Sequence, residues 1–198
     1  MSRFIAIAGG SGSGKSTLAN GLLQRLGDRA SLLGLDDYQK TKAEVPRTAS
    51  GRPNYDHPDA VNFAQFLRHL AALRAGQDLH LTRRHKRLTV DDGVVDGESV
   101  VIAARPLVIV EGYLALWHPA ARAAYDFAIF LDLPPALRVA RRRWAKDPSY
   151  VTEVLLPMHD QFIEPTKAHA DAVIQVERLD ESAVLERAWQ LLRAFGVL

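Results

Sequence analysis

The segment from Gly9 to Thr17 reads GGSGSGKST and carries the clearest chemical signal in the chain. It fits the pattern G-x-x-x-x-G-K-[ST], with an apolar run before it and a helical pattern after it. Glycines let backbone N–H groups approach phosphate oxygens closely, and the dipole of a following helix favours an anion at its first turn. The segment therefore predicts a site for a nucleoside triphosphate, with ATP as the expected ligand.

Every residue of this loop is a candidate ligand of the phosphates: Gly9, Gly10, Ser11, Gly12, Ser13, Gly14, Lys15, Ser16 and Thr17. Lys15 can reach the β- and γ-phosphates, the Ser16 hydroxyl can bind Mg²⁺, and Thr17 extends the first helical turn. A flexible glycine–serine turn without function is the alternative. The complete motif in its full context disfavours it.

Two further segments place carboxylates directly after apolar runs, where the ligands of a parallel sheet gather. LLGLDDYQK contains Asp36 and Asp37, and PLVIVEGYLAL contains Glu111. A carboxylate at Asp36 can accept a proton from an attacking hydroxyl and orient Mg²⁺. Glu111 can hold the same metal directly or through water. Without other information, Asp37 is an alternative to Asp36 as the base.

A third carboxylate, Asp56, lies in GRPNYDHPDAVNF. It can bind vicinal hydroxyls, as on a ribose, or cap a helix that Pro58 is predicted to start. Tyr38 and Tyr55 each flank one of the proposed site carboxylates. They are candidates for an acceptor pocket, and packing at the edge of the core is the alternative.

An arginine-rich helix is predicted from about Pro135 to Lys146. Arg138, Arg141 and Arg142 are spaced i, i+3 and i+4, so they are predicted to share one helical face. Guanidinium groups there can stabilise charge on a transferred phosphoryl group, and closure of such a lid excludes water. A solvated basic face or an RNA contact is the alternative.

The elements that position these residues alternate between strand and helix. Apolar runs predict strands at 4–8, 31–35, 106–110, 127–133 and 172–176, and helical spacing predicts helices between them and at 182–195, capped by Asp180 or Ser182. This order predicts an α/β fold, with a five-stranded parallel sheet of the P-loop NTPase type covered by helices on both faces. We expect one domain, 1–198, with a β-hairpin excursion at 77–105 near the acceptor site and a lid at 136–150.

Composition narrows the class of protein. The 198 residues carry a net charge of +2 and no cysteine, which excludes disulfides, thiolate metal sites and a cysteine nucleophile. The start of the chain lacks the pattern of a signal peptide, and its apolar run is too short to span a membrane. We expect a cytoplasmic protein without membrane or nucleic-acid partners. A guanine-reading N-K-x-D segment is also missing, which disfavours a GTPase.

Six motifs together resemble one family: GGSGSGKST, the aspartates at 36–37, NYDHPDA, VIVEG, FLDLPPALRVARR and PMHDQFIEPTKAHADAVI. The chain resembles the uridine kinase branch of the P-loop nucleoside kinases, relatives of phosphoribulokinase. The resemblance implies transfer of a phosphoryl group from Mg²⁺·ATP to the 5′-hydroxyl of a nucleoside, uridine or cytidine, giving ADP. It also implies Asp36 as the base, Asp56 as the ribose ligand, and Arg138 and Arg141 as lid arginines. Uridine kinases are often tetrameric, so the resemblance allows for a homo-oligomer, but the sequence does not fix the number of subunits.

The chain departs from that family where the base is normally read by aromatic residues. LTRRHKRLTV (81–90) places Arg84 near the expected Tyr, and His85 near the expected His. Three interpretations of this segment are open. It is a solvated strand, it lines a pocket that accepts several nucleosides, or it binds an acidic acceptor such as a sugar phosphate. Nicotinamide riboside is a further alternative acceptor. A non-catalytic ATP-binding regulatory protein is the alternative of a different class.

Overall fold

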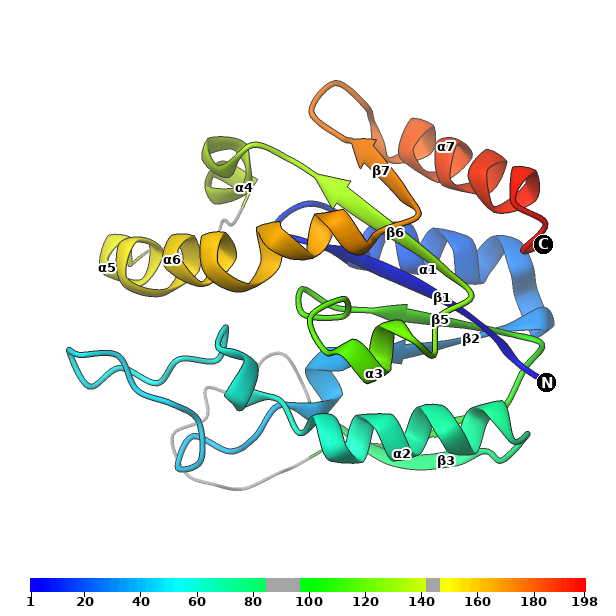
Figure 1. Ribbon diagram of the computed structural model, residues 1–198, viewed down its shortest axis with the longest axis horizontal. Coiled ribbons are helices and arrows are strands. Elements are labelled where there is room, and N and C mark those ends of the chain that lie inside the picture. Colours follow the sequence, from blue (N-terminus) through cyan, green and yellow to red (C-terminus); the bar gives the residue numbers. More distant parts are fainter. Residues whose placement is uncertain (85–96, 142–146) are drawn as a thin grey trace.

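The structure is a computed structural model that describes residues 1–84, 97–141 and 147–198. Its centre is a five-stranded sheet in the order β2-β5-β1-β6-β7, with every neighbouring pair parallel (Figure 1). The five runs predicted as strands are these five strands, so the predicted parallel sheet is confirmed. Their bounds are β1 Arg3–Gly9, β2 Ala30–Gly34, β5 Leu107–Glu111, β6 Phe127–Asp132 and β7 Ala172–Gln175.

Strands β1, β5 and β6 are buried on both faces, which explains why they are apolar at nearly every position, whereas the edge strand β7 has Val173 and Gln175 exposed. Along β1, Phe4, Ala6 and Ala8 pack into one core cluster, and Ile5 and Ile7 pack into the other. Alternate side chains of a strand point to opposite faces. A strand that alternated between polar and apolar residues would place polar groups in one of these cores.

Helices cover the two faces of the sheet (Figure 1). Side chains of α1 (Lys15–Leu26) and α7 (Glu181–Ala194) pack into one cluster with Ile5 and Ile7. Side chains of α2 (Phe63–Arg74) and α3 (Pro119–Arg122) pack into the other. The predicted cap of α7 is Asp180, whose carboxylate accepts from the N–H of Ala183 at 2.7 Å.

A second, two-stranded sheet pairs β3 (Leu79–Arg84) antiparallel with β4 (Gly97–Ile102). Leu79, Leu81 and Ile102 anchor it in the same core cluster as α2. His85, and with it the tip of the predicted base-reading segment, lies outside the described residues, and so does the side chain of Arg84. Their assignment to the acceptor pocket therefore stays a prediction.

The prediction that Pro58 starts the helix leading into α2 was wrong. Pro58–Ala60 form a separate 3₁₀ turn, and Val61 is extended, with φ −107° and ψ 134°. The α-helix begins at Phe63, after Asn62 accepts from the N–H of Gln65 through its side chain. The proline fixes one turn only, because β-branched Val61 favours extended backbone and Asn62 supplies a better cap.

The arginine-bearing helix α4 runs from Pro135 to Arg141, and the rest of the predicted helix, 142–146, lies outside the described residues. A succession of helical turns then runs from Pro148 to His169 (Figure 1). It consists of α5 (Pro148–Tyr150), a π-helical turn (Val151–Leu155), α6 (Leu156–Met158), a second π-helical turn (His159–Ile163) and a 3₁₀ turn (Glu164–His169).

The motif EPTKAHADAVI ties these turns to strand β6. The Nζ atom of Lys167 lies 2.5 Å from Oδ2 of Asp132 and 3.0 Å from Oε1 of Glu164. Asp171 accepts from the N–H of Ala128 at 2.7 Å through its side chain. This stretch of the family resemblance thus connects the helical turns after Pro148 to strand β6.

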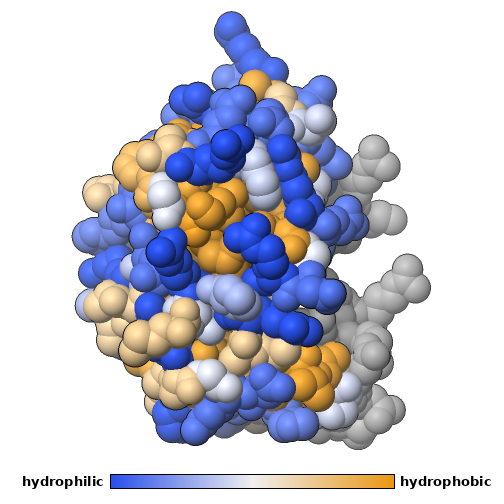
Figure 2. All heavy atoms as spheres, turned by 90° about the vertical axis from the view of Figure 1, so that its right-hand side faces the viewer, coloured by the Kyte–Doolittle hydropathy of each residue, from blue (hydrophilic) through white to orange (hydrophobic). Residues whose placement is uncertain are grey.

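Both chain termini lie on the side of the molecule opposite α4, α5 and α6 (Figure 1). On that side, hydrophilic side chains surround apolar ones (Figure 2), a mixture usual for a solvated surface. Within the described part of the chain, no helix is both long and apolar enough to cross a membrane.

Candidate active site

The glycine loop connects β1 to α1, and Lys15 is the first residue of that helix. The Lys15 side chain is 9 % exposed, and its Nζ donates to the carbonyl of Gly10 at 3.1 Å. The N–H of Ser13 donates to the same carbonyl at 3.1 Å, which closes the turn. Ser16 follows in the first turn of α1, and Thr17 beside it is exposed. The loop thus places a lysine and a helix N-terminus together, as an anion site requires.

Arg138 of α4 packs directly on this loop. A Cβ atom at Gly10 would lie 2.6 Å from its Nη1, and one at Gly12 would lie 2.7 Å from its carbonyl oxygen. Gly12 also has φ +86°, which side-chain-bearing residues rarely adopt. Gly12 therefore needs glycine, and a side chain at position 10 would have to displace the side chain of Arg138. Arg138 is 1 % exposed, and its Nε donates to the carbonyl of Leu133 at 3.1 Å.

Arg138 and Arg141, which the sequence predicts to share one helical face, differ in burial. Arg138 is buried against the loop, and Arg141 is exposed. A helix advances by about 100° per residue, so residues three apart differ by about 60° in direction. Of the side chains from Pro135 to Arg141, only Arg138 is buried. The stripe of α4 that contacts the loop is therefore narrow.

Ser16 and Glu111 meet beside the loop. The Ser16 hydroxyl lies 3.2 Å from Oε1 and 3.3 Å from Oε2 of Glu111, the last residue of β5. A hydroxyl and a carboxylate suit Mg²⁺, which usually takes one or two protein oxygens together with phosphate oxygens and water. The described residues contain no cluster of three or more His, Cys, Asp or Glu side chains that could hold a metal alone. The residues present therefore fit a metal shared with a nucleotide.

Tyr113 lies between two of the predicted site carboxylates, and the sequence did not single it out. Burial raises the pKa of its phenol well above the ordinary value, and the charges of Asp56 and Asp36 raise it further. Its hydroxyl donates to the carbonyl of Tyr55 and lies 3.4 Å from Nε2 of Gln39. Tyr113 comes two residues after Glu111, so one short segment joins the Ser16–Glu111 pair to the surroundings of Asp36 and Asp56.

The Asp56 carboxylate is held in the interior, where it is 8 % exposed. Its Oδ2 accepts from the hydroxyl of Tyr150 at 2.8 Å, and its backbone N–H donates to Oδ1 of Asn54 at 3.1 Å. The alternative role as a helix cap falls to His57, whose Nδ1 accepts from the N–H of Asp59 at 3.1 Å. Tyr150 also escaped the sequence analysis, since its contact joins residues 94 apart.

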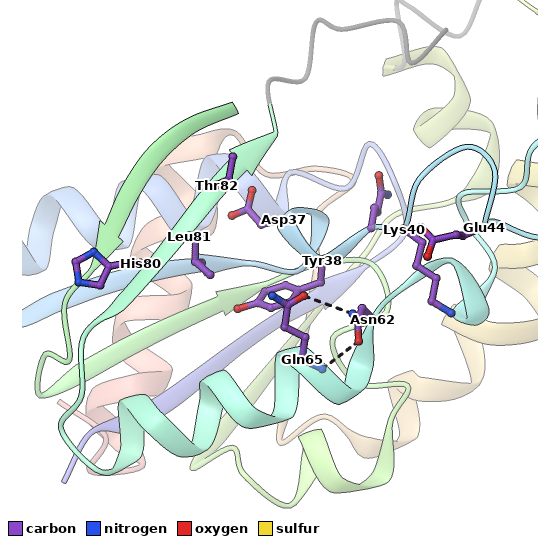
Figure 3. Close-up of a pocket in the computed structure, with 10 residues that line it drawn as sticks. Asp37, Tyr38, Lys40, Glu44, Asn62, Gln65, His80, Leu81 and Thr82 are labelled. Carbon is purple, nitrogen blue, oxygen red and sulfur yellow. Dashed lines mark hydrogen bonds between the residues drawn. The ribbon is translucent and has the colours of Figure 1, made fainter. Parts of the chain in front are cut away.

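Tyr38 is a packing residue as well as a cavity residue. Its hydroxyl pairs with Nδ1 of His69 at 2.8 Å, and its ring packs edge-on against Phe66. It also lines a cavity of about 400 Å³ with Asp37 and Gln39, between α2 and β3 (Figure 3). Gln39 is shared by this cavity and the Tyr113 contact, so the cavity adjoins the group around Asp36.

A comparison with protein families bears on this geometry. The family model of the phosphoribulokinase/uridine kinase family matches residues 4–183, nearly the whole chain. The chain belongs to this family. It is 32 % identical to a uridine kinase of Halobacterium salinarum over 184 residues, covering 86 % of this chain and 78 % of that protein. It is 35 % identical to a uridine kinase of Staphylococcus epidermidis over 185 residues, covering 86 % of each.

Solved structures support the fold. The structure of a possible uridine kinase from Bacillus stearothermophilus matches with a TM-score of 0.58 and 22 % identity, covering 88 % of this chain and 89 % of that one. A shikimate kinase from Acinetobacter baumannii, in complex with shikimate, matches with a TM-score of 0.53 and 16 % identity, covering 98 % and 94 %.

Membership of the phosphoribulokinase/uridine kinase family makes the chain a kinase, and so a transferase. The family implies ATP as the phosphate donor, in agreement with the glycine loop, Lys15 and the buried Arg138. The family match does not identify the acceptor. That question concerns the residues predicted to contact the acceptor, of which Asp36 and Asp56 both lie close enough to Tyr113 to raise its pKa.

Proposed function

We propose that the protein is an ATP-dependent nucleoside kinase that phosphorylates the 5′-hydroxyl of uridine or cytidine and releases ADP. One observation carries the proposal. Glu111, which contacts Ser16 beside the glycine loop, lies two residues from Tyr113, whose hydroxyl donates to the carbonyl of Tyr55 next to Asp56. Phosphoryl transfer is mainly a matter of positioning and charge stabilisation, so juxtaposition of the two sides is its main structural requirement.

On the donor side, the phosphates of ATP lie along Gly9–Thr17, with Lys15 at the β- and γ-phosphates. Ser16, Glu111 and Asp36 are the residues that would hold Mg²⁺. The bound metal would neutralise charge on the phosphates. Arg138, buried against Gly10, contributes a positive charge on the same side of the loop.

On the acceptor side, Asp36 takes the proton of the attacking 5′-hydroxyl, which raises the nucleophilicity of that oxygen. Asp56 accepts hydrogen bonds from the 2′- and 3′-hydroxyls of the ribose. The cavity beside Asp37 offers space for the rest of the acceptor. Relatives at 32–35 % identity carry the name uridine kinase, which supports a pyrimidine ribonucleoside as the acceptor.

A coupled assay of ADP release, across a panel of acceptors with Mg²⁺ and ATP, tests this proposal. The panel contains uridine, cytidine, nicotinamide riboside and sugar phosphates. ADP release that depends on uridine or cytidine supports the proposal. Release with another acceptor alone contradicts the proposed substrate, and no acceptor-dependent release with any compound favours a regulatory ATP-binding protein.

A further inference from the structure

Two segments far apart in the sequence are joined by polar contacts around Asp56. Side chains of residues 50–56 contact side chains of residues 147–158, a stretch that begins within the last residues of the predicted lid, 136–150. The contacts are Arg52 Nη1–Asp147 Oδ2 (2.6 Å), Arg52 Nη2–Ser149 Oγ (2.7 Å), Ser50 Oγ–Glu153 Oε2 (2.5 Å), Asn54 Nδ2–Met158 Sδ (3.2 Å) and Tyr150 OH–Asp56 Oδ2 (2.8 Å).

Only the last of these contacts reaches a proposed substrate ligand. A buried carboxylate needs hydrogen-bond donors, and the phenol of Tyr150 is one that the protein itself supplies. Asn54 fixes the backbone N–H of Asp56, and Tyr113 fixes the carbonyl of the preceding residue, Tyr55. The main chain on both sides of Asp56 is therefore held, and Tyr150 sets how its carboxylate is turned.

The turn of this carboxylate decides how many hydroxyl groups it can accept. The bond from Tyr150 uses one acceptor position on Oδ2 of Asp56. An ionised carboxylate offers about four such positions. With its plane fixed, it can accept from two adjacent hydroxyls at once. If the plane is free to rotate, the bond to the second hydroxyl weakens more than the bond to the first.

We propose that Tyr150 is a positioning residue that orients Asp56 and thereby sets the preference for a vicinal diol over a 2′-deoxy sugar. This inference rests on the proposed function, since it takes Asp56 as the ligand of the acceptor's hydroxyls. Tyr150 acts through Asp56 and not on the transferred phosphoryl group. Loss of the Tyr150 hydroxyl should therefore raise the KM for the acceptor and leave the KM for ATP unchanged.

The test compares wild type with Tyr150→Phe, with uridine and 2′-deoxyuridine as acceptors at saturating Mg²⁺·ATP. The variant keeps the ring and removes only the donor. We expect the uridine KM to rise about tenfold, because hydrogen bonds to charged groups are the stronger ones. We expect kcat to change less than about threefold and the preference for uridine over 2′-deoxyuridine to fall at least about threefold.

Two further variants separate positioning from a general loss of structure. Tyr125→Phe is the matched control, since the Tyr125 hydroxyl donates to the carbonyl of Ala115 at 3.0 Å and makes no contact with Asp56. It should leave the preference unchanged. In a double-mutant cycle, Tyr150→Phe should add little to the loss of kcat/KM that Asp56→Asn causes, because the two residues act as one unit.

The outcomes distinguish this inference from the proposed function. If wild type phosphorylates uridine and Tyr150→Phe keeps the same preference and the same KM, the inference fails and the proposed function stands. Equal additional losses in the Asp56→Asn background and in wild type also overturn it. Absence of nucleoside-dependent ADP release in wild type overturns both.

Discussion

At the scale of single residues, the phenol of Tyr113 lies close to two carboxylates of the proposed acceptor site. Burial and the charges of Asp56 and Asp36 raise the pKa of Tyr113 well above its ordinary value, so its hydroxyl keeps its proton at physiological pH. That proton is donated to the carbonyl of Tyr55. Tyr113 is therefore a fixed hydrogen-bond donor, and Asp36 remains the candidate for a group that exchanges a proton with substrate.

Asp36→Asn tests that assignment. The amide keeps the size of the side chain and cannot take a proton, so kcat should fall about 10³-fold, within the range for loss of a general base. Binding of ATP should be retained, since the glycine loop and the other two proposed metal ligands, Ser16 and Glu111, are intact. Steady-state ADP release and nucleotide-binding titration measure the two effects. Asp37→Asn is the matched control, and near-normal turnover in Asp36→Asn would remove Asp36 from its proposed role.

Sequence reasoning found the site residues that lie within or next to a recognisable pattern. Asp36 and Glu111 directly follow apolar runs, and the glycine loop carries its own motif. Tyr113 and Tyr150 carried no comparable signal. Tyr150 meets Asp56 across 94 residues, and such a contact depends on how the helical turns after Pro148 pack, which local spacing does not reveal.

At the scale of elements, α4 buries one arginine, Arg138, against the glycine loop. We expect Arg138→Met to lower kcat at least about 100-fold, since an arginine that stabilises charge on a transferred phosphoryl group has effects of that size or larger. Arg141→Met is the comparison on the same helix, and it should lower kcat less than about tenfold because Arg141 is exposed. Steady-state kinetics with thermal unfolding as a control measure both. A larger effect at Arg141 would contradict the orientation of α4 seen here.

The second π-helical turn carries a histidine whose charge opposes folding. Burial lowers the pKa of His159, Arg138 lowers it further, and Glu164 and Asp160 partly offset the shift. Burial opposes ionisation of Asp132, but hydrogen bonds from Lys167 and Gln175 lower the pKa of this carboxyl, and the charge of His159 lowers it further. A group whose pKa falls on folding contributes stability above its unfolded pKa of about 6.5, and that stability is lost as pH falls toward the folded pKa.

His159→Gln should therefore reduce the sensitivity of the fold to acid. Between pH 7.5 and pH 5, the Tm of wild type should fall by at least about 2 °C more than the Tm of the variant, a change typical of about 1 kcal/mol in a chain of this length. Thermal unfolding followed by circular dichroism measures it. Equal falls in Tm would show that His159 does not control this pH dependence.

Elements were predictable where one physical rule dominated. Burial on both faces makes a strand continuously apolar, and each of the five apolar runs is a strand of the sheet. The start of α2 was misplaced because Pro58, an extended Val61 and the capping Asn62 compete over a few residues. The difference in burial between Arg138 and Arg141 was not predictable, because the spacing of residues along a helix does not reveal how wide its buried stripe is.

At the scale of the whole molecule, the parallel sheet brings the site together. β1, β2 and β5 are neighbours, so their carboxyl ends place the glycine loop, Asp36 and Glu111 at one edge. The residues 50–56 and 147–158 meet over the same edge through Asp56 and Tyr150. Family membership and geometry therefore agree on a kinase, and the acceptor remains the point to test.

The most direct measurement is the position of the transferred phosphoryl group, followed by ³¹P NMR with wild type, Mg²⁺·ATP and uridine. The account predicts one new phosphate monoester on the 5′-oxygen of uridine, formed in the same amount as ADP and lost in Asp36→Asn. ADP that forms at the same rate without uridine, or a phosphoryl group on another oxygen, would contradict it.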